Sequence, residues 1–260
     1  MRYLKNNETV LSGRLFEMSM QKNRLSNEAF FKSAKSAGFS AVELRDSQIL
    51  PGCDTEEIRA LCEKYALHVA MLTSRTGRLN DEAGFKRFLE YLRLAEQLNC
   101  PRIKVSGNVP GLLRRAAEYA ESCGIRIGIN NHIGTGWETP EGTFRLLEMI
   151  GHPNFYCHFD PSHWYLAKAR WNEAVLKELL PKIDYFIVQD YTESPEFPSI
   201  GKRHVRMCSA EEQGCVGYPE VAGILEKLHY SGPVALVALR DMENNTNSIH
   251  QFFERSLSCF

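Results

Sequence analysis

Residues 125–163 read IRIGINNHIGTGWETPEGTFRLLEMIGHPNFYCHFDPSH, and this stretch decides the fold class. Two short apolar runs, 125–129 and 155–159, enclose a stretch with helical apolar spacing that opens with proline at position 140. Strands that are buried on both faces read as continuous apolar runs, and proline is common at the first position of a helix. The stretch therefore predicts a strand–helix–strand unit with parallel strands.

The same alternation runs along the whole chain. We expect strands over 14–18, 40–44, 67–72, 102–105, 125–129, 155–159, 183–188 and 234–239. We expect helices over 27–37, 54–65, 81–98, 111–122, 140–150, 164–180, 218–228 and 246–257. Eight such units in 260 residues favour one domain over residues 1–260, a closed (β/α)8 or TIM barrel of the α/β class. An open doubly wound sheet is the alternative, although no GxGxxG motif follows the first strand to support a dinucleotide site.

Composition narrows the range of partners. The chain has 31 basic and 32 acidic residues, which does not indicate a nucleic-acid-binding surface. No apolar run reaches the roughly 18–20 residues of a membrane span. The eight cysteines include no CxxC pair, so we expect reduced, mostly buried thiols. We therefore expect a cytoplasmic protein without nucleic-acid or membrane partners, and the sequence leaves a homo-oligomer open.

Polar residues follow several of the predicted strands. In a parallel barrel the active site lies at the carboxyl ends of the strands, so these residues are candidates for a site. Asn130, Asn131 and His132 follow the fifth strand, and Asp160 and His163 follow the sixth. Further candidates are Glu43 and Arg45 after the second strand, Lys104 in the fourth, Asp190 after the seventh, and His204 in the long segment 191–217. The alternative interpretation is structural, since Asn and Asp also end strands and cap the helices that follow.

Several of these residues belong to a recurring pattern. The marks, in chain order, are AGFSAVELR at 37–45, NH at 131–132, DPSH at 160–163, Asp190, and YSGP at 230–233. With this order and spacing the chain resembles the xylose-isomerase-like barrels, a family that includes sugar-phosphate isomerases, ketose epimerases and related endonucleases. The resemblance covers nearly all of the chain and implies a TIM barrel and a sugar-like small molecule as ligand.

The resemblance also implies a metal site, and the sequence departs from it. Epimerases of this family hold a divalent cation with residues after strands five to eight, namely a glutamate, an aspartate, a histidine and a second glutamate. The corresponding positions here carry Asn130, Asp160, Ile187 and Val237, so three of the four ligands are replaced. The family's lysine before Asp190 is replaced by Gln189. We therefore predict no cofactor, although His132 and His163 could rescue a zinc site together with Asp160.

Two function hypotheses follow. In the first, the protein is a sugar or sugar-like isomerase, epimerase or related lyase with metal-independent acid/base chemistry. His132, Asp160 and His163 would be its catalytic residues. Its substrate-binding residues would be Glu43, Arg45, Lys104, Asn130, Asn131, Asp190 and His204. In the second hypothesis, the protein is a non-catalytic homologue that binds a carbohydrate or metabolite, or serves as a partner subunit. The family's endonuclease branch is disfavoured, because the chain lacks a His- and Glu-rich metal cluster and a basic face.

Overall fold

The computed structural model describes residues 2–17, 25–49, 53–74, 76–240 and 248–258. Eight parallel strands form a closed barrel in the order β1-β11-β7-β6-β5-β4-β3-β2. These strands are β1 (Thr9–Ser12), β2 (Ala41–Arg45), β3 (His68–Thr73), β4 (Arg102–Val105), β5 (Arg126–Asn130), β6 (Phe155–Phe159), β7 (Ile183–Gln189) and β11 (Val234–Ala238). The predicted (β/α)8 barrel is thereby confirmed, and the open-sheet alternative is wrong.

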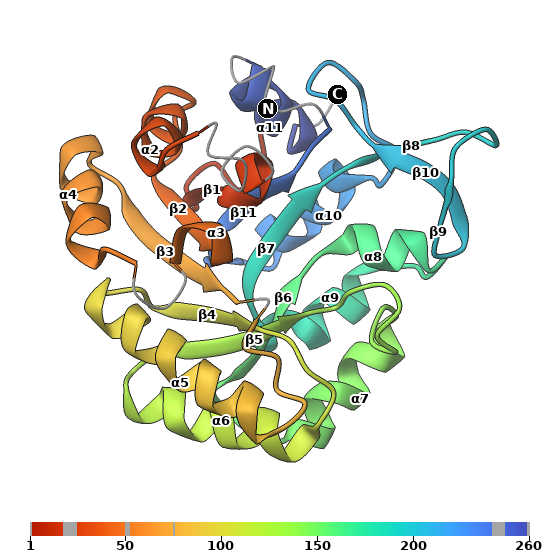
Figure 1. The fold of residues 1–260 in the computed structure, drawn as a ribbon. Coiled ribbons are helices and arrows are strands. Elements are labelled where there is room, and N and C mark those ends of the chain that lie inside the picture. Colours follow the sequence, from red (N-terminus) through yellow and green to blue (C-terminus); the bar gives the residue numbers. More distant parts are fainter. Residues whose placement is uncertain (1, 18–24, 50–52, 75, 241–247, 259–260) are drawn as a thin grey trace. The chain divides into compact units, whose positions relative to one another are not determined.

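Helices connect the strands, as parallel pairing requires. They are α2 (Asn27–Ser36), α3 (Asp46–Ile49), α4 (Thr55–Tyr65), α5 (Glu82–Gln97), α6 (Pro110–Ser122), α7 (Pro140–Ile150), α8 (Pro161–Leu166), α9 (Glu173–Leu179), α10 (Tyr218–Lys227) and α11 (Ile249–Ser256). Figure 1 shows α5 and α6 side by side, and the rings of Phe85 and Tyr119 meet between them at 5.6 Å. The predicted helix over 246–257 begins at two residues that lie outside the described part of the chain.

The ends of α2 follow local sequence signals. The hydroxyl of Ser26 accepts a hydrogen bond from the backbone N–H of Ala29 at 3.2 Å, which satisfies a free donor of the first turn. Gly38 then adopts a φ of 79°, a left-handed conformation that costs glycine little and stops the helix. Ser26 therefore caps the start of α2, and Gly38 ends it.

The first predicted strand is misplaced. A strand was expected over 14–18, whereas β1 covers Thr9–Ser12 and a 3₁₀ helix covers Gly13–Phe16. The hydroxyl of Ser12 accepts a hydrogen bond from the backbone N–H of Arg14 at 3.2 Å, which turns the chain out of the strand. Met18 lies outside the described residues. Leu15 and Phe16 are buried by the turn rather than by strand pairing, which explains their apolar character.

One predicted helix is broken in two. The expected helix over 164–180 is replaced by α8 and α9, with a break after Ala167. Lys168 has a φ of 57°, which an α-helix cannot accommodate. Asn172 then starts α9, because its side chain accepts a hydrogen bond from the N–H of Val175 at 2.9 Å.

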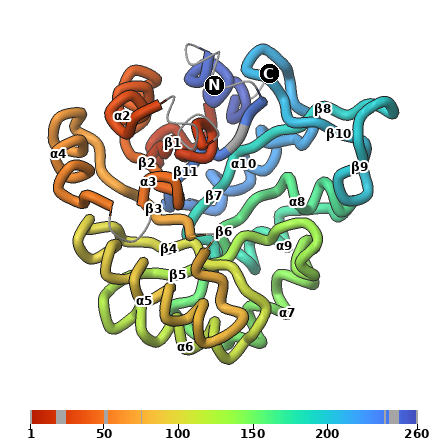
Figure 2. Tube along the Cα trace, in the orientation of Figure 1, coloured from red at the N-terminus to blue at the C-terminus, as the bar shows by residue number. Residues whose placement is uncertain are grey.

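The long segment after β7 contains a small sheet that the sequence did not predict. Three short antiparallel strands, β8 (Tyr191–Glu193), β9 (Ser199–Ile200) and β10 (Arg203–Met207), pair in the order β8-β10-β9. Figure 2 shows them grouped together in the segment that follows β7. Strands this short carry too few residues for a clear alternating pattern.

The cysteines are free thiols throughout the described residues, as expected. Cys100, Cys157 and Cys208 are buried, but Cys215 is exposed and the others are partly exposed. The expectation that most of them are buried is therefore only partly correct.

Contacts divide the chain into two compact units. One consists of Met1–Thr9, Asn131–Leu146 and Cys157–Phe260, and the other of Val10–Asn130 and Leu147–Tyr156. The candidate residues are distributed over both units. The assignment of residues 1–260 to one domain stays a prediction.

Candidate functional site

Asp160 is the centre of a buried polar cluster in the first unit. It directly follows β6 and caps α8, with Oδ1 accepting a hydrogen bond from the N–H of Ser162 at 2.9 Å. Pro161 at the first helical position needs no such acceptor, because it has no N–H. The capping interpretation of Asp160 is thus correct, but capping uses one oxygen only.

Asn131 holds the backbone of Asp160 in place. Its amide oxygen accepts a hydrogen bond from the N–H of Asp160 at 2.8 Å, and its amide nitrogen donates to the carbonyl of Asp160 at 2.9 Å. Asn131 is almost fully buried, so this paired contact fixes the end of β6. The structure places Asn131 as a support for Asp160, and a direct contact with substrate stays a prediction.

Two further side chains donate to the Asp160 carboxylate. The amide of Gln189 donates to Oδ2 at 2.6 Å, and the hydroxyl of Tyr218 donates to Oδ1 at 3.2 Å. Burial raises the pKa of Tyr218 well above its usual value, and the negative charge of Asp160 raises it further. The hydroxyl therefore keeps its proton and remains a donor. Donors on both oxygens match an ionised carboxylate, which accepts hydrogen bonds and donates none.

His163 and His132 extend the cluster. Nε2 of His163 lies 3.4 Å from Oδ2 of Asp160 and 3.2 Å from the amide nitrogen of Gln189. The ring of His132 lies against that of His163, with centroids 4.1 Å apart and an angle of 41° between the planes. His163 is buried, whereas His132 is exposed. The predicted catalytic residues His132, Asp160 and His163 are therefore brought together.

The protonation pattern of His132 follows from one contact. Nδ1 of His132 lies 2.8 Å from the carbonyl oxygen of Ile133. A carbonyl oxygen can only accept, so Nδ1 carries a proton. In the neutral ring Nε2 is then the basic nitrogen, on an exposed side chain.

A second charged group occupies the other unit. Oε1 of Glu43 accepts hydrogen bonds from the hydroxyl of Thr73 at 2.6 Å and from Lys104 and Arg45, both at 3.3 Å. Burial alone would raise the pKa of Glu43, but the positive charges of Lys104 and Arg45 outweigh it and hold the pKa at about 2. Arg45 also lies 3.9 Å from Glu17. Glu43, Arg45 and Lys104 thus meet one another, as substrate-binding residues at neighbouring strand ends would.

The remaining predicted residues lie elsewhere. Oδ1 of Asn130, at the end of β5, is a buried atom without a hydrogen-bond partner among the described residues. His204 is exposed on β10, where Nδ1 lies 3.0 Å from the carbonyl of Phe197. Asp190 lines a cavity whose described lining includes none of His132, Asp160 and His163. Convergence of Glu43 and Asp190 with the cluster stays a prediction.

Sequence reasoning missed the contribution of Gln189 and Tyr218. Gln189 was noted only as the replacement of a lysine, and Tyr218 only as part of a helix. One feature of the sequence could have indicated a role for Tyr218. It follows Gly217 at the start of a helix, where a bulky side chain can reach the strand ends. Nothing in the sequence indicated that its hydroxyl contacts both Asp160 and the backbone of Gln189, which donates to it at 3.0 Å.

The donor set does not fit the divalent cation of the family's epimerases. Ile187 and Val237, at two ligand positions, have only carbon in their side chains and are buried. The Asp160 carboxylate already accepts from Ser162, Gln189 and Tyr218. In the described part of the chain no group of three or more His, Cys, Asp or Glu residues is placed to hold a metal. The zinc rescue by the two histidines therefore has no support in the described geometry.

Fold and site together define a parallel (β/α)8 barrel with a buried histidine–carboxylate cluster after the fifth, sixth and seventh barrel strands. The family model described as "Xylose isomerase-like TIM barrel" matches residues 31–254. The chain belongs to this family.

Solved structures with the same fold cover nearly all of the chain. The probable 3-DHS dehydratase of Bacillus anthracis is 15% identical with a TM-score of 0.72, covering 96% of this chain and 97% of that one. D-psicose 3-epimerase of Clostridium cellulolyticum H10, solved with D-tagatose, is 12% identical with a TM-score of 0.72, covering 97% and 100%. A xylose isomerase domain protein of Salmonella typhimurium LT2 is 18% identical with a TM-score of 0.73, covering 98% and 97%. At these identities the likeness establishes the fold alone.

The search of curated proteins returned no match. Among the described helices, none has the length and apolar character needed to cross a membrane.

Proposed function

We propose that the protein is an enzyme that moves a proton next to the carbonyl group of a sugar or sugar-like polyol, with histidine chemistry in place of a metal ion. The reaction would be an epimerisation, an isomerisation or an elimination. The family supports chemistry on sugars, and its structural neighbours include an epimerase and a dehydratase. The observation that carries the proposal is the basic nitrogen of His132, exposed beside a buried His163–Asp160 pair.

His132 is the general base in this proposal. Its Nδ1 proton is held by the carbonyl of Ile133, so Nε2 is the nitrogen that takes a proton from the carbon next to the carbonyl. The bonding electrons move onto the carbonyl oxygen and form an enediolate. A proton that reaches the opposite face from solvent, while His132 releases its own to solvent, gives an epimer. Return of the His132 proton to the neighbouring carbon, with a proton moving between the two enediolate oxygens, gives an isomer. Loss of a β-hydroxyl group, protonated as it leaves as water, gives the elimination product.

His163 and Asp160 stabilise the charge that this step creates. A proton on His132 produces an imidazolium ring in contact with His163. The Asp160 carboxylate lies 3.4 Å from the His163 ring and is itself shielded from water. A buried negative charge at this distance favours positive charge on the pair of rings. Asp160 acts through His163, so it is a positioning and electrostatic residue in this scheme, while His132 contacts the substrate.

Gln189 and Tyr218 take the place that a cation would hold at Asp160. Both donate to the carboxylate, which would otherwise be left buried without compensation. The proposal therefore requires no divalent ion for the proton transfer. Contacts of substrate with Glu43, Arg45 and Lys104 stay predictions.

Turnover in the presence of chelator tests the proposal. The purified protein, dialysed against EDTA, is incubated with a panel of ketoses, aldoses and sugar acids, and products are followed by NMR. With any substrate found, His132→Ala and Asp160→Asn should abolish turnover without unfolding the protein. His250→Ala is the matched control, since His250 is an exposed histidine on α11. Turnover that persists in His132→Ala would contradict the assignment of the base.

A non-catalytic binding protein is the second candidate. The observation that favours it is the Asp160 carboxylate, whose hydrogen bonds from three protein groups are those of a structural anchor. This hypothesis predicts binding of a sugar-like ligand, measured by calorimetry, without any product by NMR over long incubation.

A further inference from the structure

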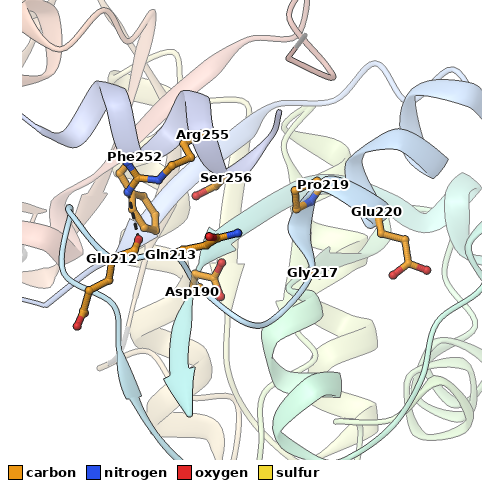
Figure 3. A pocket seen from close by; sticks show the side chains of 10 residues that line it. Asp190, Glu212, Gln213, Gly217, Pro219, Glu220, Phe252, Arg255 and Ser256 are labelled. Atoms are coloured by element: carbon orange, nitrogen blue, oxygen red, sulfur yellow. Dashed lines mark hydrogen bonds between the residues drawn. The ribbon is translucent and has the colours of Figure 1, made fainter. Parts of the chain in front are cut away.

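A cavity of about 290 Å³ lies in the first unit, at the start of α10 and the end of α11 (Figure 3). Its walls include the apolar Phe252 and Pro219, the hydroxyl of Ser256 and the amide of Gln213. A cavity of this size is at the lower end of ligand sites and holds a small molecule, not a large cofactor. The cavity is separate in its lining from the histidine cluster, so what it binds goes beyond the proposed function.

Asp190 provides the buried charge of this cavity. Its side chain is nearly buried, and Figure 3 shows the carboxylate in the space between Gln213 and Gly217. Backbone N–H groups of Tyr191 at 2.8 Å and Val216 at 3.1 Å both donate to Oδ1. The N–H of Cys215 also faces this carboxylate. A carboxylate has about four acceptor positions, so capacity is left for a ligand.

Gly214 lies directly against that carboxylate, and only a residue without a Cβ fits there. A Cβ atom at this position would lie only 1.8 Å from Cγ of Asp190 and 2.0 Å from Oδ2. Any side chain here would occupy the space next to the acid. The segment after β10 therefore approaches Asp190 as bare backbone.

The charges around the cavity favour a positive ligand. The lining contains three acidic side chains, Asp190, Glu212 and Glu220, and the basic Arg255. Glu212 pairs with Arg206, which leaves Asp190 and Glu220 against Arg255. Nη2 of Arg255 donates to the carbonyls of Ala210 and Glu212, at 2.7 and 3.1 Å, so its guanidinium is engaged with the backbone.

The carboxyl end of α11 adds negative charge at the cavity. Helix α11 finishes at the cavity with Phe252, Arg255 and Ser256, and the carboxyl end of a helix carries partial negative charge. The positive amino end of α10 lies at the opposite wall, where the acidic Glu220 offsets it.

We propose that this cavity is a binding site for a small organic cation with a primary ammonium group. The ammonium would donate to Oδ2 of Asp190, and a short aliphatic part would lie against Phe252 and Pro219. Charge-assisted hydrogen bonds of this kind are about twice as strong as neutral ones. An alcohol of the same shape lacks the charge, and a carboxylate of the same shape meets repulsion.

Protonation of Asp190 should compete with such a ligand. Burial raises its pKa to about 6, against the lowering effect of the neighbouring backbone N–H groups. The other titratable groups facing it are Cys208, Cys215 and Tyr218, with Glu212, Glu220 and Arg255 in the cavity lining. At pH 5 about a tenth of Asp190 is ionised and at pH 7.5 nearly all of it, so affinity should rise about tenfold across this range.

Titration calorimetry with four probes of matched size tests the proposal on the full-length protein. Butylamine and 1,4-diaminobutane carry ammonium groups, whereas 1-butanol and butyrate are the neutral and anionic controls. We expect the amines to bind with one site per chain, and the controls to bind at least tenfold more weakly. Asp190→Asn should weaken amine binding at least tenfold, and Glu220→Gln should weaken it less. Glu196→Gln removes an exposed acid outside the cavity lining and should leave affinity unchanged.

Three outcomes would overturn the proposal. Equal binding of butylamine and 1-butanol would show that the ligand's charge does not contribute to affinity. Equal effects of Asp190→Asn and Glu196→Gln on amine affinity would show that Asp190 does not bind the ammonium group. Absence of binding by either amine at pH 7.5 would exclude the site. If Asp190→Asn does not fold, the Glu220→Gln comparison and the pH dependence of the wild type give the same decision.

Discussion

Asp190 should make the stability of the protein depend on pH. The pKa of its carboxyl is about 6 in the folded protein, compared with an ordinary value of 3.8, because burial penalises the charged form. The folded state therefore binds this proton more tightly than the unfolded state. The resulting stabilisation is complete below pH 3.8 and is lost as pH rises through 6.

The size of this effect follows from the two pKa values. Each pKa unit corresponds to about 1.4 kcal/mol, so the difference is worth about 3 kcal/mol between pH 4 and pH 8. Asp190→Asn removes the titration but keeps an oxygen that can accept from Tyr191 and Val216. The free energy of unfolding of the variant, relative to wild type, should therefore rise by about 3 kcal/mol from pH 4 to pH 8.

Urea denaturation of both proteins at pH 4, 5, 6, 7 and 8 measures this difference. Glu196→Gln, which removes an exposed acid, serves as the control and should track the wild type. The expected difference curve has its midpoint near pH 5, halfway between the two pKa values. A difference between Asp190→Asn and wild type that stays constant over the whole range would refute the reasoning.

Three further predictions concern the two polar groups and the metal. Gln189→Leu should lower the free energy of unfolding by about 1–3 kcal/mol in urea melts, because Oδ2 of Asp160 loses its donor while remaining buried; an unchanged stability would show that this hydrogen bond is dispensable. Glu43→Gln should lower the free energy of unfolding by about 3 kcal/mol at pH 7, because the pKa of Glu43 is held at about 2. The contribution of Glu43 to stability is present above pH 4.5 and is lost only as pH falls through 2. Equal stability of the variant and wild type at pH 7 would mean that Lys104 and Arg45 do not compensate for its burial. Elemental analysis after dialysis without chelator should find negligible metal, and EDTA should leave the melting temperature unchanged; near one equivalent of metal per chain, with a melting temperature lowered by EDTA, would contradict the assignment of the donor set.

The barrel could be predicted because its strands are buried on both faces. Runs such as 125–129 and 155–159 stand out from the amphipathic helices between them, and their order repeats along the chain. The first strand was misplaced because Leu15 and Phe16 are apolar for another reason, their burial in a 3₁₀ turn. The break at Lys168 was also missed, since a positive φ at lysine leaves no mark in the sequence.

The candidate site was predictable only in part. Asp160, His132 and His163 lie near each other in sequence around two strand ends, and strand ends of parallel neighbours meet at one edge. Gln189 and Tyr218 reach Asp160 from 29 and 58 residues further along the chain. Contacts of that range depend on how side chains pack between elements, which local patterns do not encode. Asp190 was selected for its place after a strand, but its cavity is lined by α10, α11 and the segment 212–217, which come later in the chain.

Solvent deuterium exchange follows the very proton that His132 is proposed to move. The EDTA-treated protein is incubated in D₂O with the substrate found in the screen, and NMR follows the C–H signal next to the carbonyl. Wild type and His250→Ala should lose this signal, whereas His132→Ala should retain it. Exchange that appears only after a divalent metal is added, or that continues in His132→Ala, would contradict the proposed mechanism.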